Sequence, residues 1–141
     1  MRRFTRYLKK GKSAHVNWEE APDVNARLTS LVRRLKFNWI KTASIYCARS
    51  QGSSTRAIAR IWGLSRIWQL ALAKKPYYII EVISERYDRL GEMEKDKILL
   101  HEIAHIPQNF SGSLIPHIKV GKRSFSHKVD ILVAQYLRSR L

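Results

Sequence analysis

The chain of 141 residues has only one cysteine, Cys47. A single cysteine excludes an intramolecular disulfide, and it also excludes a zinc site built from several thiolates. Cys47 lies in the apolar segment Ile45-Tyr46-Cys47-Ala48. We therefore expect a buried, unreactive thiol at this position.

Long apolar runs are missing as well. The longest covers only a handful of residues, which is far short of a membrane-spanning helix. The N-terminus, Met1-Arg2-Arg3-Phe4-Thr5-Arg6, is basic, but the apolar stretch that a secretory signal requires does not follow it. These features predict a cytoplasmic protein without a membrane partner.

Acidic side chains are scarce. The chain has 11 Asp and Glu against 27 Lys and Arg, which gives a formal net charge of +16. Residues 1–75 alone carry 17 basic and 3 acidic side chains. A basic half of this strength is typical of proteins that contact a polyanion, with nucleic acid first and a membrane surface second, and we expect DNA or RNA as the partner. The alternative is a highly charged surface without a specific partner.

The remaining composition is that of an ordinary folded domain, with 45% hydrophobic and 27% charged residues. The length suits one domain. We predict a basic N-terminal arm over residues 1–16 and a single domain over residues 17–141. The order of the expected elements (helix, three or four strands, helix, helix) predicts an α+β fold with a small, mostly antiparallel sheet.

The apolar periodicity predicts where these elements lie. A first helix, capped by Asp23, is expected, with Val24, Leu28, Leu31, Val32 and Leu35 at helical spacing on its apolar face. Apolar and β-branched runs predict strands over 40–49, 56–62, 67–73 and 77–83, with a hairpin turn at 63–66. A second helix is expected from about Gly91 through His105 to Pro107, and a last helix after a cap at Ser126.

The motif that indicates chemistry is His101-Glu102-Ile103-Ala104-His105. Residues four apart lie on one face of a helix, so both imidazoles can reach a single ion. Neutral imidazole binds Zn²⁺ well, and zinc lowers the pKa of a bound water to about 7. Glu102, next to the first ligand, is placed to take a proton from that water. The motif therefore predicts a zinc site with Glu102 as the catalytic base.

A catalytic zinc usually has three protein ligands and one open position. Gln108 and Ser111 occupy the positions where a metzincin has Gly and His, and no Glu follows Glu102. The remaining candidates for the third ligand are His117, His127 and Asp130. His117 is favoured because the polar loop before it, with Gly112 and Pro116, has the residues of a turn back towards the helix.

These residues also resemble a known family. The run from His101 to Pro107, Asn109-Phe110-Ser111-Gly112 and Pro116-His117 are similar to the phage and archaeal metallopeptidase family, as are Tyr78-Ile79-Ile80-Glu81-Val82 and Glu20-Ala21-Pro22-Asp23. The resemblance covers about residues 17–141. It implies a minimal zincin-like domain in which His101, His105 and His117 bind zinc and Glu102 is the acid/base. More loosely, the layout resembles SprT-like proteases, which act on DNA-bound proteins.

Two hypotheses about function follow. The first is a zinc metallopeptidase that hydrolyses a peptide or protein substrate, with nucleic-acid-associated proteins as one class of target. An edge strand within 67–83 is expected to pair with the extended substrate. The second is a non-catalytic, zinc-containing protein that binds nucleic acid or ribonucleoprotein. Glu102 distinguishes the two, since a structural zinc site has no use for it and needs a fourth ligand instead.

Overall fold

The computed structural model describes residues 15–117 and 124–141. The predicted arm, residues 1–16, lies almost entirely outside the described residues, so the domain boundary stays a prediction. The elements are β1 (Asn17–Glu20), α2 (Pro22–Arg34), a 3₁₀ turn (Thr42–Ser44), β2 (Ile45–Gln51), β3 (Ala59–Gly63), α3 (Arg66–Leu72), β4 (Tyr78–Ile83), α4 (Ser84–Tyr87), α5 (Glu92–Ile103) and α6 (Phe125–Ser139). None of these helices is long and apolar enough to cross a membrane.

The four strands form one sheet in the order β1-β2-β4-β3. β1 pairs antiparallel with β2, and β3 pairs antiparallel with β4, whereas the central pair β2 and β4 is parallel. The parallel pair requires a crossover, and the chain makes it through β3 and α3. The predicted α+β class and the small, mostly antiparallel sheet are confirmed.

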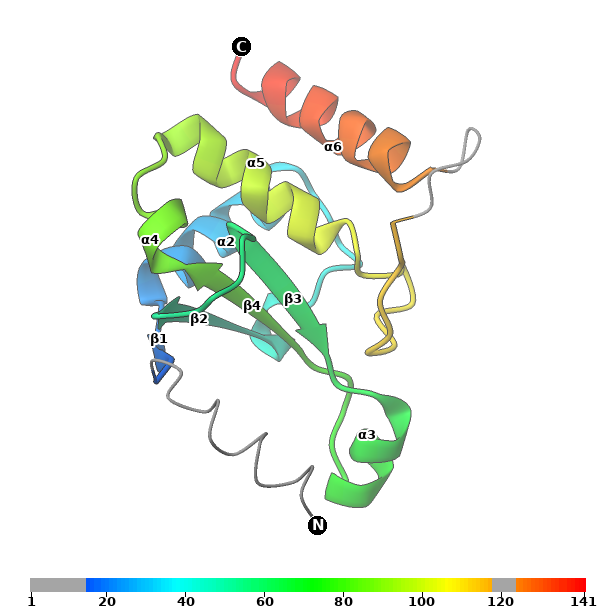
Figure 1. Cartoon of the computed structure of the whole chain (residues 1–141). Coiled ribbons are helices and arrows are strands. Elements are labelled where there is room, and N and C mark those ends of the chain that lie inside the picture. Colours follow the sequence, from blue (N-terminus) through cyan, green and yellow to red (C-terminus); the bar gives the residue numbers. More distant parts are fainter. Residues whose placement is uncertain (1–14, 118–123) are drawn as a thin grey trace.

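Helices cover one face of the sheet and form the core with it (Figure 1). Tyr78, Ile80 and Val82 of β4 alternate towards this face and are fully buried. α2 and α5 lie on it, and α6 packs against α5. The helices are also joined by charge, since Arg27 of α2 forms ion pairs with Glu92 and Asp96 of α5. Cys47 is buried as predicted, and burial raises the pKa of its thiol to about 12.

The predicted strand over 67–73 and its hairpin turn are wrong. This segment is helix α3, which lies between the paired strands β3 and β4. Gln69, Leu70, Ala71 and Leu72 are good helix formers, and a short apolar run does not by itself distinguish a strand from a helix. The helix ends at Ala73, which is left-handed with φ = 52°, while the amide of Lys74 bonds to the carbonyl of Gln69.

Two predicted helix caps are shifted. α2 begins at Pro22, with Ala21 as its N-cap, so Asp23 lies within the first turn. The proline favours this start because its fixed φ suits the first helical position. α6 begins one residue before the predicted cap: Ser124 accepts the backbone N–H of His127, and Ser126 lies inside the helix. β1 was not predicted; all four of its residues are exposed, so it lacks an alternating pattern.

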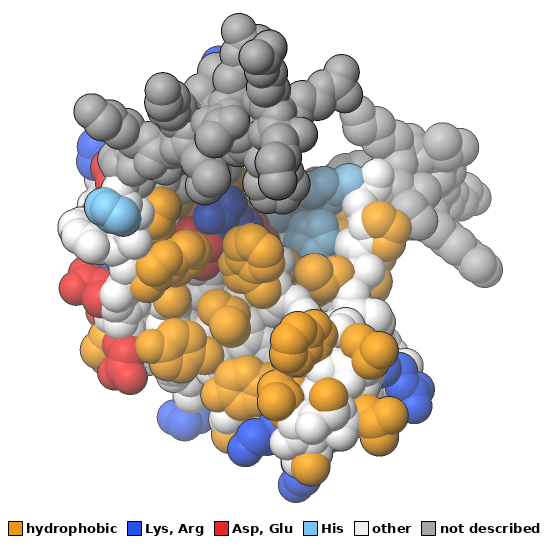
Figure 2. Space-filling model, turned by 60° about the horizontal axis from the view of Figure 1, so that its bottom comes forward, with side chains coloured by type: hydrophobic (Ala, Val, Ile, Leu, Met, Phe, Trp, Pro, Cys, Tyr) orange, Lys and Arg blue, Asp and Glu red, His pale blue; other side chains and the backbone are white. Residues whose placement is uncertain are grey.

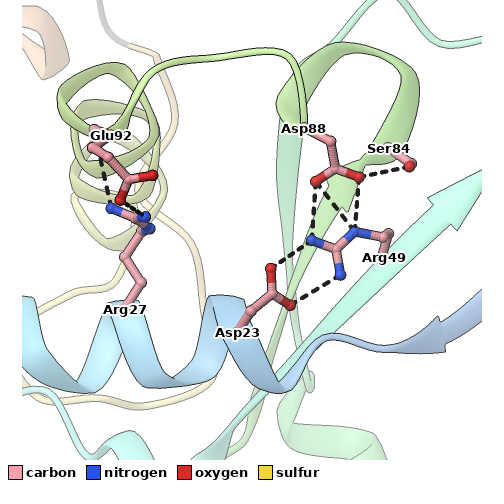
Figure 3. Close-up of polar contacts among 6 residues, drawn as sticks. All are labelled: Asp23, Arg27, Arg49, Ser84, Asp88 and Glu92. Atoms are coloured by element: carbon pink, nitrogen blue, oxygen red, sulfur yellow. Dashed lines mark hydrogen bonds and ion pairs between the residues drawn. The ribbon is translucent and has the colours of Figure 1, made fainter.

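Arg49 of β2 connects three elements (Figure 3). Its guanidinium donates to both carboxylate oxygens of Asp23 in α2, at 3.0 and 2.7 Å. It also donates to Asp88, directly after α4, at 2.9 and 3.0 Å. The bonds from Arg49 lower the pKa of Asp23. Burial alone would raise the pKa of Asp88, but the hydrogen bonds from Arg49 and Ser84 outweigh it and lower this pKa too.

Replacing Arg49 with methionine is expected to reduce the free energy of unfolding by about 2 kcal/mol at neutral pH, because two partly exposed carboxylates lose a charged donor. Both carboxyls have a lower pKa in the folded state than in the unfolded chain. Their stabilisation is therefore present above the unfolded value of about 3.9 and is lost as the pH falls through the folded values.

The difference between wild type and Arg49→Met should thus shrink in acid, which urea unfolding at neutral pH and at about pH 3 measures. Arg33→Met is the matched control, since Arg33 is exposed on α2. An equal loss of stability in the control would contradict the assignment of this effect to the Asp23–Arg49–Asp88 network.

Candidate metal centre

Helix α5 carries the first part of the site. It begins after Gly91, and Glu92 and Glu94 in its first turn suit the positive end of the helix dipole. The helix was predicted to run to His105, but it ends at Ile103. The chain nevertheless continues in a tight turn, because the amide of His105 bonds to the carbonyl of Glu102 at 3.1 Å. The ring centroids of His101 and His105 are consequently only 5.5 Å apart.

The loop after α5 returns to this helix end. The amide of Ile115 donates to the carbonyl of His105 at 2.7 Å. In the opposite direction, Nδ1 of His105 lies 2.6 Å from the carbonyl oxygen of Ile115. This oxygen can only accept, so Nδ1 carries the proton and Nε2 keeps its lone pair for a metal. His117 lies two residues further along and reaches the same place, with its ring centroid 4.5 Å from that of His105.

The three imidazoles form one cluster. The candidate ligand nitrogens of His101, His105 and His117 all lie within 4.8 Å of one another. Zn–N distances are about 2.0–2.1 Å, so small side-chain rotations suffice to bring the three around one ion. The other candidates for the third ligand, His127 and Asp130, are exposed on α6 and do not belong to this group. Of the three alternatives, the fold brings only His117 to the pair on α5.

The electrostatics of the cluster favour neutral ligands. Burial lowers the pKa of His101, and the neighbouring His105 and His117 lower it further. The pKa of His105 is also lowered, first by burial and then by His117, against the opposing bond to Ile115. Neutral imidazole is the form that binds a cation. The donor set therefore fits a borderline-soft ion such as zinc.

Glu102 lies between the two histidines of the motif and is only 7% exposed. Burial raises the pKa of its carboxyl to about 7. A carboxyl with a pKa near neutrality can both accept and return a proton, as a general base requires.

A protein-family model described as putative phage metallopeptidase matches residues 16–129, which is most of the chain. The chain belongs to this family. The resemblance seen in the sequence is thereby confirmed, and the matched region includes both the motif and His117. Comparisons with curated proteins and with solved structures give no significant match.

In this member of the phage metallopeptidase family, a groove of about 590 Å³ runs along the histidine cluster. One wall is His101, Glu102, His105 and His117, and the other is the segment 56–61, which includes most of β3. β3 is an edge strand, because it has β4 on one side only. The edge strand predicted within 67–83 is thus wrong: 67–73 belongs largely to a helix, and β4 is central.

Phe125, the first residue of α6, was missed by the sequence analysis. Its ring stacks on His105 at 4.1 Å between centroids, and it lies 5.0 Å from His101 and 4.6 Å from His117. The side chain is buried, so it shields the cluster from water on the side of α6. The sequence pattern did not indicate this role, because a single Phe at the start of a helix is usually a core residue.

The residues that hold the His117 loop were also missed. Tyr78 of β4 accepts the amide of Gly112 and donates to the carbonyl of Ser113, both at 2.8 Å. Gln69 of α3 donates to the carbonyls of Leu64 and Ser111, at 2.7 and 2.8 Å.

Glycine is required where this loop meets the β3–α3 turn. A Cβ on Gly112 would lie 2.3 Å from both Leu64 O and Gln69 Nε2, and Gly112 has φ = 95°. Such contacts between distant segments leave no signal in local sequence patterns.

Tyr78→Phe is expected to weaken metal binding about tenfold, since it frees Gly112 and Ser113 and loosens the loop that carries His117. The phenyl ring keeps its edge contact with Phe110, at 4.9 Å between centroids. The melting temperature of the variant should therefore stay close to that of wild type, although its metal affinity is lower. Zinc competition titration measures the effect, with Tyr77→Phe as the matched control on a half-exposed neighbour. Equal affinities in the two variants would show that Tyr78 does not position the ligand loop.

Proposed function

We propose that this chain is a zinc-dependent peptidase that cleaves protein or peptide substrates in the groove between β3 and α5. The observation that carries the proposal is the convergence of three imidazoles beside Glu102. Membership of a metallopeptidase family supports the same reaction class.

Zinc is the proposed ion because the cluster offers three neutral nitrogen donors. When bound, zinc supplies Lewis-acid chemistry that polarises a carbonyl group and makes water more acidic. His101, His105 and His117 would hold it. A purely structural zinc needs a fourth protein ligand. Within the part of the chain that the structure describes, the histidine group has three members, which supports a catalytic site over the non-catalytic alternative.

The chain's own residues account for substrate alignment and proton transfer. The free edge of β3 has backbone groups available to pair with an extended peptide, which would lie across the histidine cluster. Glu102 would take the proton from the attacking water and then deliver it to the leaving amine. Phe125 limits the access of solvent from the side of α6.

The test is hydrolysis of an unfolded protein such as casein, and the release of labelled peptides measures the rate. The zinc-loaded chain should hydrolyse it, the metal-free chain should not, and added zinc should restore the activity. A zinc-loaded chain without activity on casein and on a random peptide library would contradict the proposal.

Nucleic-acid-associated proteins remain the proposed target class, and the proposal depends on the charge of the N-terminal half alone. Deleting residues 1–12 removes Arg2, Arg3, Arg6, Lys9, Lys10 and Lys12. DNA affinity should fall steeply with salt, with a log–log slope of about −0.9 per phosphate contacted, and the truncation should flatten that slope. Absence of DNA binding at about 50 mM salt, where such contacts are strong, would remove nucleic acid as a partner.

The cytoplasmic location stays a prediction.

A further inference from the structure

Helix α3 exposes nearly all of its apolar side chains. Ile67 is 74% exposed, Trp68 55%, Leu70 83% and Leu72 51%. Gln69 is the half-buried member of the helix, and it connects α3 to the rest of the domain. Single exposed hydrophobic residues are normal on a protein surface. Four large apolar side chains exposed on one seven-residue helix form a contiguous patch, which is typical of an interaction site.

The apolar surface continues from α3 onto the sheet. Trp62, Tyr77 and Ile79 are each between about one third and one half exposed. They line a pocket of about 570 Å³ that lies between the strands and the end of α3. Figure 2 shows hydrophobic side chains gathered over this face of the molecule. We call these three residues and the four apolar residues of α3 the apolar face.

Positive charge lies along the margin of the apolar face at α3. Arg66 precedes the exposed residues of the helix, and Lys74 and Lys75 follow it at the rim of the pocket; all three are exposed. No acidic residue occurs in the sequence between Asp23 and Glu81. Lys and Arg side chains lie along the lower margin of the face in Figure 2. The surface that is to be covered is therefore apolar in the middle and cationic along the margin at α3, while Glu19 borders the side beside Trp62 and Ile79.

We propose that the apolar face docks on an anionic lipid membrane, with α3 lying in the headgroup region. A short helix with Trp and aliphatic side chains on its outer side and basic residues beside them is suited to an interface between hydrocarbon and phosphate. Trp68, Trp62 and Tyr77 are amphipathic aromatics of the kind that occupy this level. α3 also lies at the end of the molecule away from α6, where a flat surface can reach it (Figure 1).

Other occupants fit the face less well. A symmetric contact between two copies pairs this patch with itself, so it would bring the cluster of Arg66, Lys74 and Lys75 into an interface that repeats the same positive charge. Nucleic acid matches the charge, but bases stack on aromatic rings, whereas the most exposed groups, Leu70 and Ile67, are aliphatic. The proposal departs from the prediction of no membrane partner. That prediction depended on the lack of a spanning segment and a signal, and a helix lying on the surface needs neither.

The test is sedimentation of the full chain with vesicles of phosphatidylcholine alone or with about one-third phosphatidylserine. Wild type should bind the anionic vesicles at least about tenfold more tightly. Ile67→Ser and Leu70→Ser should each weaken this binding about tenfold, since each removes inserted apolar area. The double variant Lys74→Gln/Lys75→Gln should weaken it about twentyfold at low salt.

Matched controls lie on α6. Ile131 is 48% exposed, so Ile131→Ser removes an exposed aliphatic group outside the apolar face, and Arg138→Gln removes an exposed charge. Both should bind vesicles within about twofold of wild type. A blue shift of tryptophan fluorescence on binding should be reduced in Trp68→Phe and reduced further when Trp62→Phe is added, because both indoles belong to the apolar face.

Three results would overturn the proposal. The first is no binding to anionic vesicles at low salt, or equal losses in the α3 variants and the α6 controls. The second is a wild-type dimer that Leu70→Ser converts to a monomer, which would assign the face to a second copy. The third is binding of a single-stranded oligonucleotide that depends on Leu70 while vesicle binding does not, which would assign the face to nucleic acid.

Discussion

Glu102→Gln is expected to lower peptide hydrolysis by at least about a hundredfold while the zinc content stays at the wild-type level. The amide has the shape of the carboxylate but cannot accept the proton of the attacking water. Because Glu102 is not in the group of three histidines proposed to hold the ion, the three imidazoles should still bind it. A general base typically contributes about 10²–10⁴-fold to a rate, so the loss should be unmistakable.

The stability of this variant provides a second readout. Burial raises the pKa of Glu102, so ionising this carboxyl destabilises the metal-free fold as the pH rises from about 4 towards 7. Glutamine cannot ionise, and metal-free Glu102→Gln should therefore melt at or above the wild-type temperature at neutral pH. Glu94→Gln, which is an exposed position on the same helix, is the control for both measurements. Hydrolysis at the wild-type rate in Glu102→Gln would show that this residue is not the base.

Of all the substitutions, replacing a histidine of the cluster is expected to lower the zinc affinity most. Wild type should bind about one Zn²⁺ per chain, since the described residues contain one group of three close ligands. His101→Ala, His105→Ala and His117→Ala should each weaken zinc binding by more than about a hundredfold. Removing a residue that only hydrogen-bonds to a ligand typically costs about 10–100-fold, so the loss of a ligand itself should exceed this range. His127→Ala should leave the affinity unchanged, because His127 is exposed on α6.

The pH dependence of zinc binding follows from the same imidazoles. The pKa values of His101 and His105 are lowered, mainly by burial, so both are neutral at pH 7. Protons should compete with zinc only below the ordinary imidazole pKa of about 6.5, and affinity should then drop as the pH falls further. Elemental analysis and competition titration measure stoichiometry and affinity. A stronger effect of His127→Ala than of His117→Ala would move the third ligand to α6.

The structure also links the two surfaces that the proposals concern. Gln69 holds α3 against the β3–α3 turn and bonds to Ser111 in the loop that carries His117. The helix that we propose to dock and the loop that carries His117 therefore share one side chain. The vesicle experiment needs no peptidase activity, so failure of either proposal leaves the other intact.

Much of the local architecture was decided by the sequence itself. The spacing of His101 and His105 follows from the helical period, and the burial of Val24, Leu28, Leu31 and Val32 was predicted from the same period. The strand Tyr78–Ile83 was predicted almost to the residue, because alternation and β-branched side chains agree there. Such features depend on neighbours within a few positions along the chain.

Only the tertiary structure decided which segments meet. The placement of His117 beside the two histidines of the motif depends on hydrogen bonds between His105 and Ile115, and on Tyr78 holding Gly112 from 34 positions away. The strand-like run at 67–73 became a helix because β3 and β4 pair with each other and leave it outside the sheet. Contacts of this kind join groups far apart in the sequence, and their free energy depends on distances that no local pattern encodes.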